Sequence, residues 1–186
     1  MSNRMTEQTK EWVIEALFEL LQTEELSHIT VQEICDCAQI SRKTFYRRFR
    51  SKNDVLKLFY QKKIIEYKKA VKMVPLKNFI DLIRFFFDFW DKSKNELIIL
   101  QNRNLLFNLQ NEYNSQAKSI YSVTDFPWHL ENKKSNELKI SLLMYWSIGG
   151  LWNIVSIWLK DYPNKSSQEI ANLLIEALLE TSKLTS

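Results

Sequence analysis

Apolar residues recur every three or four positions along most of this chain, which is the period of a helix that buries one face. In residues 7–22, for example, Val13 and Leu17 fall on the face opposite Glu11 and Glu15. The same period predicts further helices over residues 52–72, 76–92, 94–121, 138–160 and 167–183. With only 2 glycines and 3 prolines there is little turn chemistry for a sheet, so we expect an all-α fold.

Three hydroxyl side chains divide residues 30–54 into two short helices and the start of a third. Thr30 with Glu33 forms a capping box, Ser41 is an N-cap, and Ser51 with Asp54 is a variant of the box. A turn at residues 38–40 separates the two short helices. A short helix, a turn and a basic second helix together predict a helix-turn-helix, in which Phe45 and Phe49 should be core residues.

The stretch TVQEICDCAQISRKTFYRRFRSKNDVL, residues 30–56, resembles the DNA-binding signature of the TetR/AcrR family of bacterial transcriptional regulators. The resemblance extends over about residues 9–60. It implies a three-helix DNA-binding domain over residues 1–55, a connector helix over 56–75, and a C-terminal helical bundle for effector binding and dimerisation over 76–186. Pro75 would end the connector, because proline lacks a backbone donor.

The helix of residues 42–49 is the expected reading helix. If it enters the major groove, its early residues contact base edges or nearby phosphates, while the resemblance assigns Thr30, Tyr46 and Lys52 to the phosphate backbone. The DNA-binding candidates are Thr30, Arg42, Lys43, Thr44, Tyr46, Arg47 and Lys52. Two positions depart from the family pattern: Gln39 stands where glycine is usual, and Lys43 where a small residue is usual. Gln39 in a left-handed turn would cost about 1 kcal/mol.

The charge distribution agrees with a nucleic-acid partner. The net charge is +4, but residues 42–72 contain 12 basic and 2 acidic side chains, whereas residues 1–41 contain 2 basic and 8 acidic ones. A run of charge is usually only a solvated face. Next to a helix-turn-helix, however, a block this one-sided is expected for phosphate binding. The twofold symmetry of a homodimer would make its double-stranded operator palindromic or nearly so.

The C-terminal half is rich in aromatic residues, which have two interpretations. They fill an ordinary core, as aromatic stripes at helical spacing usually do, or they enclose an apolar effector cavity with a few polar groups. The pocket candidates are Phe86, Trp90, Arg103, Phe107, Trp128, His129, Tyr145 and Trp146. The effector would be small and apolar or aromatic.

The last two predicted helices are the expected homodimer interface, because the family resemblance implies a four-helix contact there. The interface candidates are Ile148, Gly149, Gly150, Leu151, Val155, Leu174 and Leu178. Residues 140–159 carry no charge over a length that could span a membrane. An adaptor anchored to a membrane or a partner protein through this helix, with its basic block on anionic lipid, is therefore the alternative.

Catalytic chemistry is sparse in this sequence. The 2 histidines lie away from any set with metal-ligand spacing, Cys35 and Cys37 project to nearly opposite sides of one helix, and glycine-rich phosphate loops are absent. We therefore expect a non-enzymatic protein without cofactor or metal. The N-terminus lacks the apolar segment of a signal peptide, so a cytoplasmic location is expected. The leading hypothesis is a dimeric, sequence-specific DNA-binding repressor that is controlled by a small apolar effector.

Overall fold

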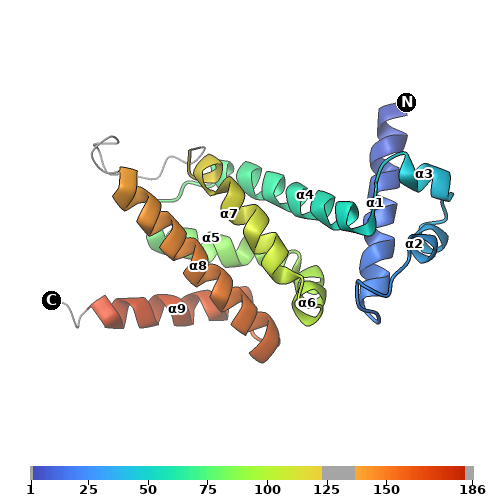
Figure 1. Ribbon diagram of the computed structural model, residues 1–186. Helices are drawn as coiled ribbons and strands as arrows, with labels where there is room; N and C mark the ends of the chain where they lie inside the picture. Colours follow the sequence, from blue (N-terminus) through green and yellow to red (C-terminus); the bar gives the residue numbers. More distant parts are fainter. Residues whose placement is uncertain (1, 123–136, 183–186) are drawn as a thin grey trace.

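The molecule is built from helices drawn out along one direction. The structure is a computed structural model that describes residues 2–122 and 137–182, and within these ranges it contains helices and no strand. The predicted all-α fold is therefore confirmed. Figure 1 shows three helices gathered at one end of the molecule, namely α1 (Ser2–Leu21), α2 (Val31–Cys37) and α3 (Arg42–Tyr46). We call these three helices, with the turns between them, the head.

α4 (Lys52–Met73) runs from the head into the other end of the molecule (Figure 1). Ser51 begins this helix, because its Oγ accepts the backbone N–H of Asp54 at 3.4 Å and the Asp54 carboxylate accepts the backbone N–H of Arg50 at 2.8 Å. Val74, in extended conformation directly before Pro75, ends it. The helix packs on α1 near its start and on α7 and α5 further along, so it belongs to both ends.

The other end of the molecule, which we call the body, has five helices among its described residues. They are α5 (Phe79–Asp91), α6 (Lys94–Asn102), α7 (Leu106–Ser122), α8 (Glu137–Asp161) and α9 (Ser167–Ser182). α5 packs on α9, and α8 packs on α6 and α7. A capping box at Ser166 and Glu169 begins α9: the Glu169 carboxylate accepts the Ser166 N–H at 2.8 Å, and Ser166 Oγ accepts the Glu169 N–H at 3.2 Å.

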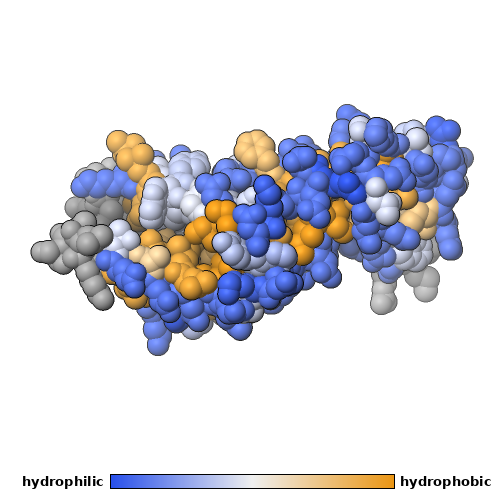
Figure 2. Space-filling view, turned by 90° about the horizontal axis from the view of Figure 1, so that it is seen from below, coloured by the Kyte–Doolittle hydropathy of each residue, from blue (hydrophilic) through white to orange (hydrophobic). Residues whose placement is uncertain are grey.

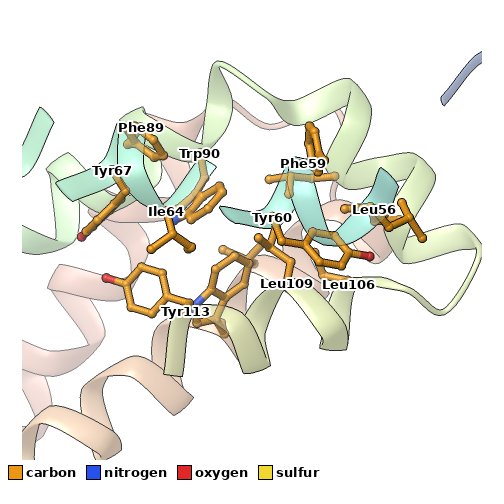
Figure 3. Packing of buried hydrophobic residues seen from close by; sticks show 14 of the residues in the cluster. Leu56, Phe59, Tyr60, Ile64, Tyr67, Phe89, Trp90, Leu106, Leu109 and Tyr113 are labelled. Atoms are coloured by element: carbon orange, nitrogen blue, oxygen red, sulfur yellow. The ribbon is translucent and has the colours of Figure 1, made fainter. Parts of the chain in front are cut away.

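Aromatic side chains from four helices fill the centre of the body. The rings of Tyr67, Phe86, Trp90, Tyr113 and Trp152 lie 4.8 to 6.4 Å apart in centroid distance, mostly edge to face. Figure 3 shows part of this packing, with side chains of α4 lying between those of α5 and α7. The far end of α4 is thereby fixed within the core of the body.

The segment 94–121, expected as one helical stretch, is two helices. Asn104 adopts a left-handed conformation, with φ of 56°, and the backbone N–H of Leu105 donates to the carbonyl of Leu100 at 2.7 Å. Polar residues 101–104 interrupt the apolar period at this point, but polar residues alone do not predict the end of a helix. Asparagine is one of the few non-glycine residues that tolerate this conformation. The loop expected at residues 122–134 lies, from residue 123 onwards, outside the described residues.

Candidate nucleic-acid interface

The capping box at Thr30 sets the start of α2. Thr30 Oγ1 accepts the backbone N–H of Glu33 at 3.2 Å, and the Glu33 carboxylate accepts both the backbone N–H and the hydroxyl of Thr30 at 2.7 Å. These hydrogen bonds hold the pKa of the Glu33 carboxyl below its usual value, because they favour the charged form. The predicted capping box is confirmed, and in it the Thr30 hydroxyl is hydrogen-bonded to the Glu33 carboxylate.

The turn between α2 and α3 contains the left-handed residue that the sequence suggested. Gln39 has φ of 52°, and the next backbone N–H, that of Ile40, donates to the carbonyl of Cys35 at 2.9 Å. A side chain with a Cβ is strained in this region of conformational space. The turn therefore forms without glycine and keeps some strain.

α3 is a helix of five residues whose conformation depends on its cap and on two buried rings. Ser41 Oγ accepts the backbone N–H of Thr44 at 3.1 Å and lies 3.0 Å from the Thr44 hydroxyl. Phe45 and Phe49 are buried, as predicted. Arg42, Lys43 and Arg47 are exposed on the remaining surface of the helix and its C-terminus. The fold thus presents a row of cations on a firmly anchored short helix.

Tyr46 extends this basic surface. Its side chain is half exposed, and the Arg42 guanidinium lies over its ring, 5.8 Å from the centroid. The phenol hydroxyl of an exposed tyrosine can donate a hydrogen bond to a phosphate oxygen. Arg42, Lys43, Tyr46 and Arg47 form what we call the reading face, with Thr44 half-buried beside them and Thr30 exposed at the start of α2.

Lys52 lies differently from what the family resemblance implies. Its ammonium group donates to the backbone carbonyls of Ser27, at 3.0 Å, and Ile29, at 2.5 Å. These carbonyls belong to the loop that leads into α2. In this structure Lys52 therefore ties the start of α4 to that loop. The sequence signal for phosphate binding is equally a signal for this internal contact, since both need a cation at this position.

The predicted pocket residues do not come together around one cavity. Phe86 and Trp90 are fully buried in the aromatic core, while Phe107, Tyr145 and Trp146 are exposed on the surface. Arg103 reaches out of the body to the end of α1. Trp128 and His129 lie outside the described residues. The described candidates therefore lie on different faces of their helices, because the face that each residue presents depends on packing that periodicity does not reveal.

A cavity does exist, between α4, α5, α7 and α8. Its volume is about 80 Å³, counted as the space that the centre of a water-sized sphere can occupy. No side chain that lines it is charged; the lining residues are Tyr67, Val71, Phe79, Leu82, Tyr113, Ala117, Ile120, Tyr121, Ile140, Leu143, Met144, Ser147 and Ile148. The space suits a small apolar molecule or a few waters.

Two phenols provide the buried polar groups of this cavity. The hydroxyls of Tyr67 and Tyr113 interact with each other, and Figure 3 shows them turned towards each other. Burial raises the pKa of both phenols above the usual value, since the charged form would lose its solvation. Both hydroxyls are thus protonated at neutral pH, and the cavity offers neutral hydrogen-bonding groups.

The interface candidates divide into buried and accessible residues. Ile148, Leu151 and Val155 are buried within the protomer, Gly149, Leu174 and Leu178 are half-buried, and Gly150 is exposed. Leu151 and Val155 therefore pack in the protomer's own core. The period marked α8 as apolar, but it could not separate the face on α6 and α7 from the face left outside.

Large apolar side chains are exposed on the same two helices. We define the C-terminal apolar face as Leu138, Leu142, Tyr145, Trp146 and Ile157 of α8 with Leu173 of α9, each of them 48 to 71% exposed. Figure 2, which views the molecule from the side where α9 lies in Figure 1, shows hydrophobic surface over the body and a mostly hydrophilic head. A group of large exposed apolar side chains is typical of a surface that binds another protein.

Neither metal nor membrane chemistry is prominent in the described part of the chain. Within residues 2–122 and 137–182, no group of three or more His, Cys, Asp or Glu side chains could hold a metal ion. One helix there, Glu137–Asp161, is long and apolar enough to cross a membrane by length and composition alone. One side of it is nevertheless packed in the body, as core helices of globular proteins also are.

Comparison with known proteins agrees with the geometry of the head. Residues 13–58 match the family model described as "Bacterial regulatory proteins, tetR family". This range spans the C-terminal part of α1 from residue 13, the helix-turn-helix and the start of α4. The search of curated proteins found no match.

Solved structures resemble the whole chain. One is described as "Dihydroxyacetone kinase operon activator DhaS", with 15% identity, a TM-score of 0.60, and 95% of this chain and 97% of that chain covered. A TetR transcriptional regulator from Streptococcus agalactiae 2603V has 17% identity, a TM-score of 0.59 and coverages of 92% and 94%. A tetR-family regulator from Streptomyces coelicolor has 17% identity, a TM-score of 0.54 and coverages of 95% and 85%. At these identities the likeness is one of fold.

Proposed function

We propose that this chain, whose residues 13–58 match the tetR family of bacterial regulatory proteins, is a homodimeric, sequence-specific DNA-binding repressor. The observation that carries the proposal is the reading face: Arg42, Lys43, Tyr46 and Arg47 are exposed on a short helix whose other side is buried. A basic helix with outward cations fits the major groove, where arginine and lysine read guanine edges and phosphates.

A dimer follows from the C-terminal apolar face and from the symmetry of operators. Exposed leucine, isoleucine and tryptophan side chains lie on α8 and α9, which project away from the head in Figure 1. A second copy of the same face would cover them around a twofold axis. The two reading faces would then contact half-sites about one duplex turn, ~34 Å, apart or slightly more, so the operator is palindromic.

The cavity is the proposed site of a small, uncharged, mostly apolar effector. Its lining carries no charge, and its polar groups are neutral hydroxyls, such as those of Tyr67 and Tyr113. α4 lines it through Tyr67 and Val71 and continues to the head. A ligand that favours one tilt of α4 would change the spacing of the two heads, which needs about 1–3 kcal/mol of coupling.

Selection of DNA from a pool of random duplexes tests the proposal. The expected result is an enriched palindrome, bound at least about 1000-fold more tightly than random DNA at one salt concentration. The double variant Arg42→Ala/Lys43→Ala should lose this preference and keep the helical content and dimer mass of the wild type. A wild-type protein that enriches no sequence, or that binds every duplex equally, would sink the proposal.

The sign of regulation is tested separately. DhaS is named an activator, and at 15% identity it shares the fold with this chain. Transcription in vitro from a promoter that contains the selected palindrome should decrease when the protein is added. An increase in transcript would make the protein an activator that uses the same DNA-binding surface.

The rival function is an adaptor anchored through α8, which the length and apolar composition of Glu137–Asp161 favour. The two hypotheses predict different behaviour in solution. A regulator sediments without detergent at twice the chain mass of 22.3 kDa and stays unbound when mixed with vesicles of anionic lipid. Flotation with the vesicles, together with aggregation in the absence of detergent, would support the adaptor instead.

A further inference from the structure

Arg103 connects the body to the C-terminal end of α1, although the two segments lie about 80 residues apart in sequence. Its Nε donates to the carbonyl of Leu21 at 2.7 Å, and one terminal nitrogen donates to the carbonyl of Gln22 at 2.8 Å. The other terminal nitrogen donates to the Glu25 carboxylate at 3.1 Å. All three nitrogens of the guanidinium group are therefore used on one target, and the side chain is only 19% exposed.

The acceptors are groups that a helix end leaves without helical partners. The carbonyls of Glu19 and Leu20 accept backbone N–H groups of residues 22–24 in the turn after α1, and the next two carbonyls accept from Arg103. A helix C-terminus carries partial negative charge, which favours a cation there. The planar guanidinium fits this set better than an ammonium group would, because its N–H directions are fixed.

The backbone of Arg103 is held by the body. It is the C-cap of α6, where its N–H donates to the carbonyl of Ile99 at 3.0 Å, and the left-handed Asn104 follows. α6 is itself joined to α8, since the Ser156 hydroxyl donates to the Gln101 side-chain carbonyl at 3.1 Å. The backbone of Arg103 is therefore held beside α8, one of the proposed dimer helices, and its side chain binds the head.

We propose that Arg103 is a positioning residue for DNA binding, which fixes the orientation of the head relative to the body and hence the spacing of the two reading faces. α4 alone would join head and body at one place and leave the head free to swing about it. Arg103 adds a second attachment at the C-terminal end of α1, beyond the contact of Phe18 with Phe59 of α4. The inference rests on the proposed function, because it concerns how that function selects one operator spacing.

The test compares Arg103→Gln with Arg103→Lys and with Arg84→Gln, which replaces an exposed arginine of α5. The probes are labelled duplexes that carry the palindrome selected by the wild-type protein, with the half-site spacing kept or changed by one or two base pairs. For Arg103→Gln we expect affinity for the original spacing to fall about 10-fold and the discrimination between spacings to shrink. Arg103→Lys should be intermediate, and Arg84→Gln should match the wild type.

A duplex with a single half-site serves as the internal control, because its binding does not depend on the spacing of two heads. A purely structural role would weaken single half-site and palindrome alike. The proposal is overturned if a folded, dimeric Arg103→Gln variant keeps the spacing discrimination of the wild type, or if it loses affinity equally for both duplexes.

Hydrogen exchange provides a readout that does not need DNA. Backbone amides of residues 22–29 should exchange about 10-fold faster in Arg103→Gln than in the wild type, with α3 unchanged. If this variant does not fold, Glu25→Gln decides: faster exchange in residues 22–29 supports the contact, and wild-type exchange overturns it. A wild-type protein that selects no DNA refutes the proposed function, while the exchange result still reports whether Arg103 holds the end of α1.

Discussion

The ammonium group of Lys52 lies 2.5 Å from the carbonyl oxygen of Ile29 and 3.0 Å from that of Ser27. Hydrogen bonds from a charged donor to buried or half-buried carbonyls contribute more to stability than neutral ones. Replacing Lys52 with Ala should therefore lower the free energy of unfolding by about 2 kcal/mol. Urea denaturation followed by circular dichroism measures this change.

The same variant also decides between two roles for Lys52. If it contacts phosphate, Lys52→Ala flattens the salt dependence of DNA binding by about one unit and leaves stability unchanged. The structure favours the opposite result, a loss of stability with the salt slope retained. An unchanged denaturation midpoint would instead support a contact between Lys52 and a DNA phosphate.

Lys43 gives the complementary prediction, because it is exposed on the reading face. Lys43→Ala should leave the free energy of unfolding within about 0.5 kcal/mol of the wild-type value. The slope of log K against log salt concentration should fall by about one unit if Lys43 meets a phosphate. Fluorescence anisotropy at several salt concentrations measures the slope, and Lys69→Ala, an exposed lysine of α4, is the matched control. Equal slopes in the wild type, Lys43→Ala and Lys69→Ala would show that Lys43 contacts no phosphate.

Gln39 gives a prediction of increased stability. Its φ of 52° is a conformation that glycine adopts without strain, although glycine also adds freedom to the unfolded chain. Gln39→Gly should raise the free energy of unfolding by about 0.5 kcal/mol, whereas Gln39→Ala should give no increase. Asn104→Gly is a useful comparison, since asparagine tolerates this conformation better and the gain there should be smaller. A Gln39→Gly protein no more stable than Gln39→Ala would show that glycine relieves no strain at this position.

The interface prediction distinguishes an exposed residue from a buried one on the same pair of helices. Leu173→Arg should give a folded monomer, because Leu173 is 52% exposed and the change places a charge in the proposed interface. Leu151→Arg should unfold the protomer, because Leu151 is buried. Ile65→Arg on α4, with 51% exposure, is the control that should remain dimeric. Sedimentation and thermal melting separate these outcomes, and a Leu173→Arg dimer of normal stability would contradict the proposed face.

The cavity prediction concerns ligand binding without DNA. Ala117 lines the cavity and is buried, so Ala117→Leu should fill part of the available space. We expect the affinity for an environment-sensitive apolar dye to fall about 10-fold or more, while DNA affinity without ligand stays near the wild-type value. Fluorescence titration measures the first quantity and anisotropy the second. A dye that binds both proteins equally would lie elsewhere on the molecule.

Local signals in the sequence were sufficient for the head. Thr30, Ser41 and Ser51 begin three helices where their side chains predict them, since a cap acts within four residues of itself. Gln39 could be recognised as a strained turn residue because the resemblance marked a glycine position. These features are decided by neighbours in sequence, so tertiary packing had little to change.

Packing between distant segments was beyond the sequence. Phe86 and Phe107 carry the same kind of side chain on helical patterns, yet one is buried at 1% exposure and the other is 65% exposed. Arg103 was expected in a pocket, but it lies at the end of α6 and its side chain reaches α1. Only the assembled structure shows which face of each helix meets a neighbour.

The reading helix has five residues, far fewer than an isolated helix needs to persist in water. Its shape is therefore maintained by Ser41 beneath its first turn and by Phe45 and Phe49 behind it. The outward positions Arg42, Lys43 and Arg47 contribute little to that maintenance, so evolution can exchange them one at a time without risk to the fold. DNA sequence preference in such a protein can therefore change while the scaffold stays constant.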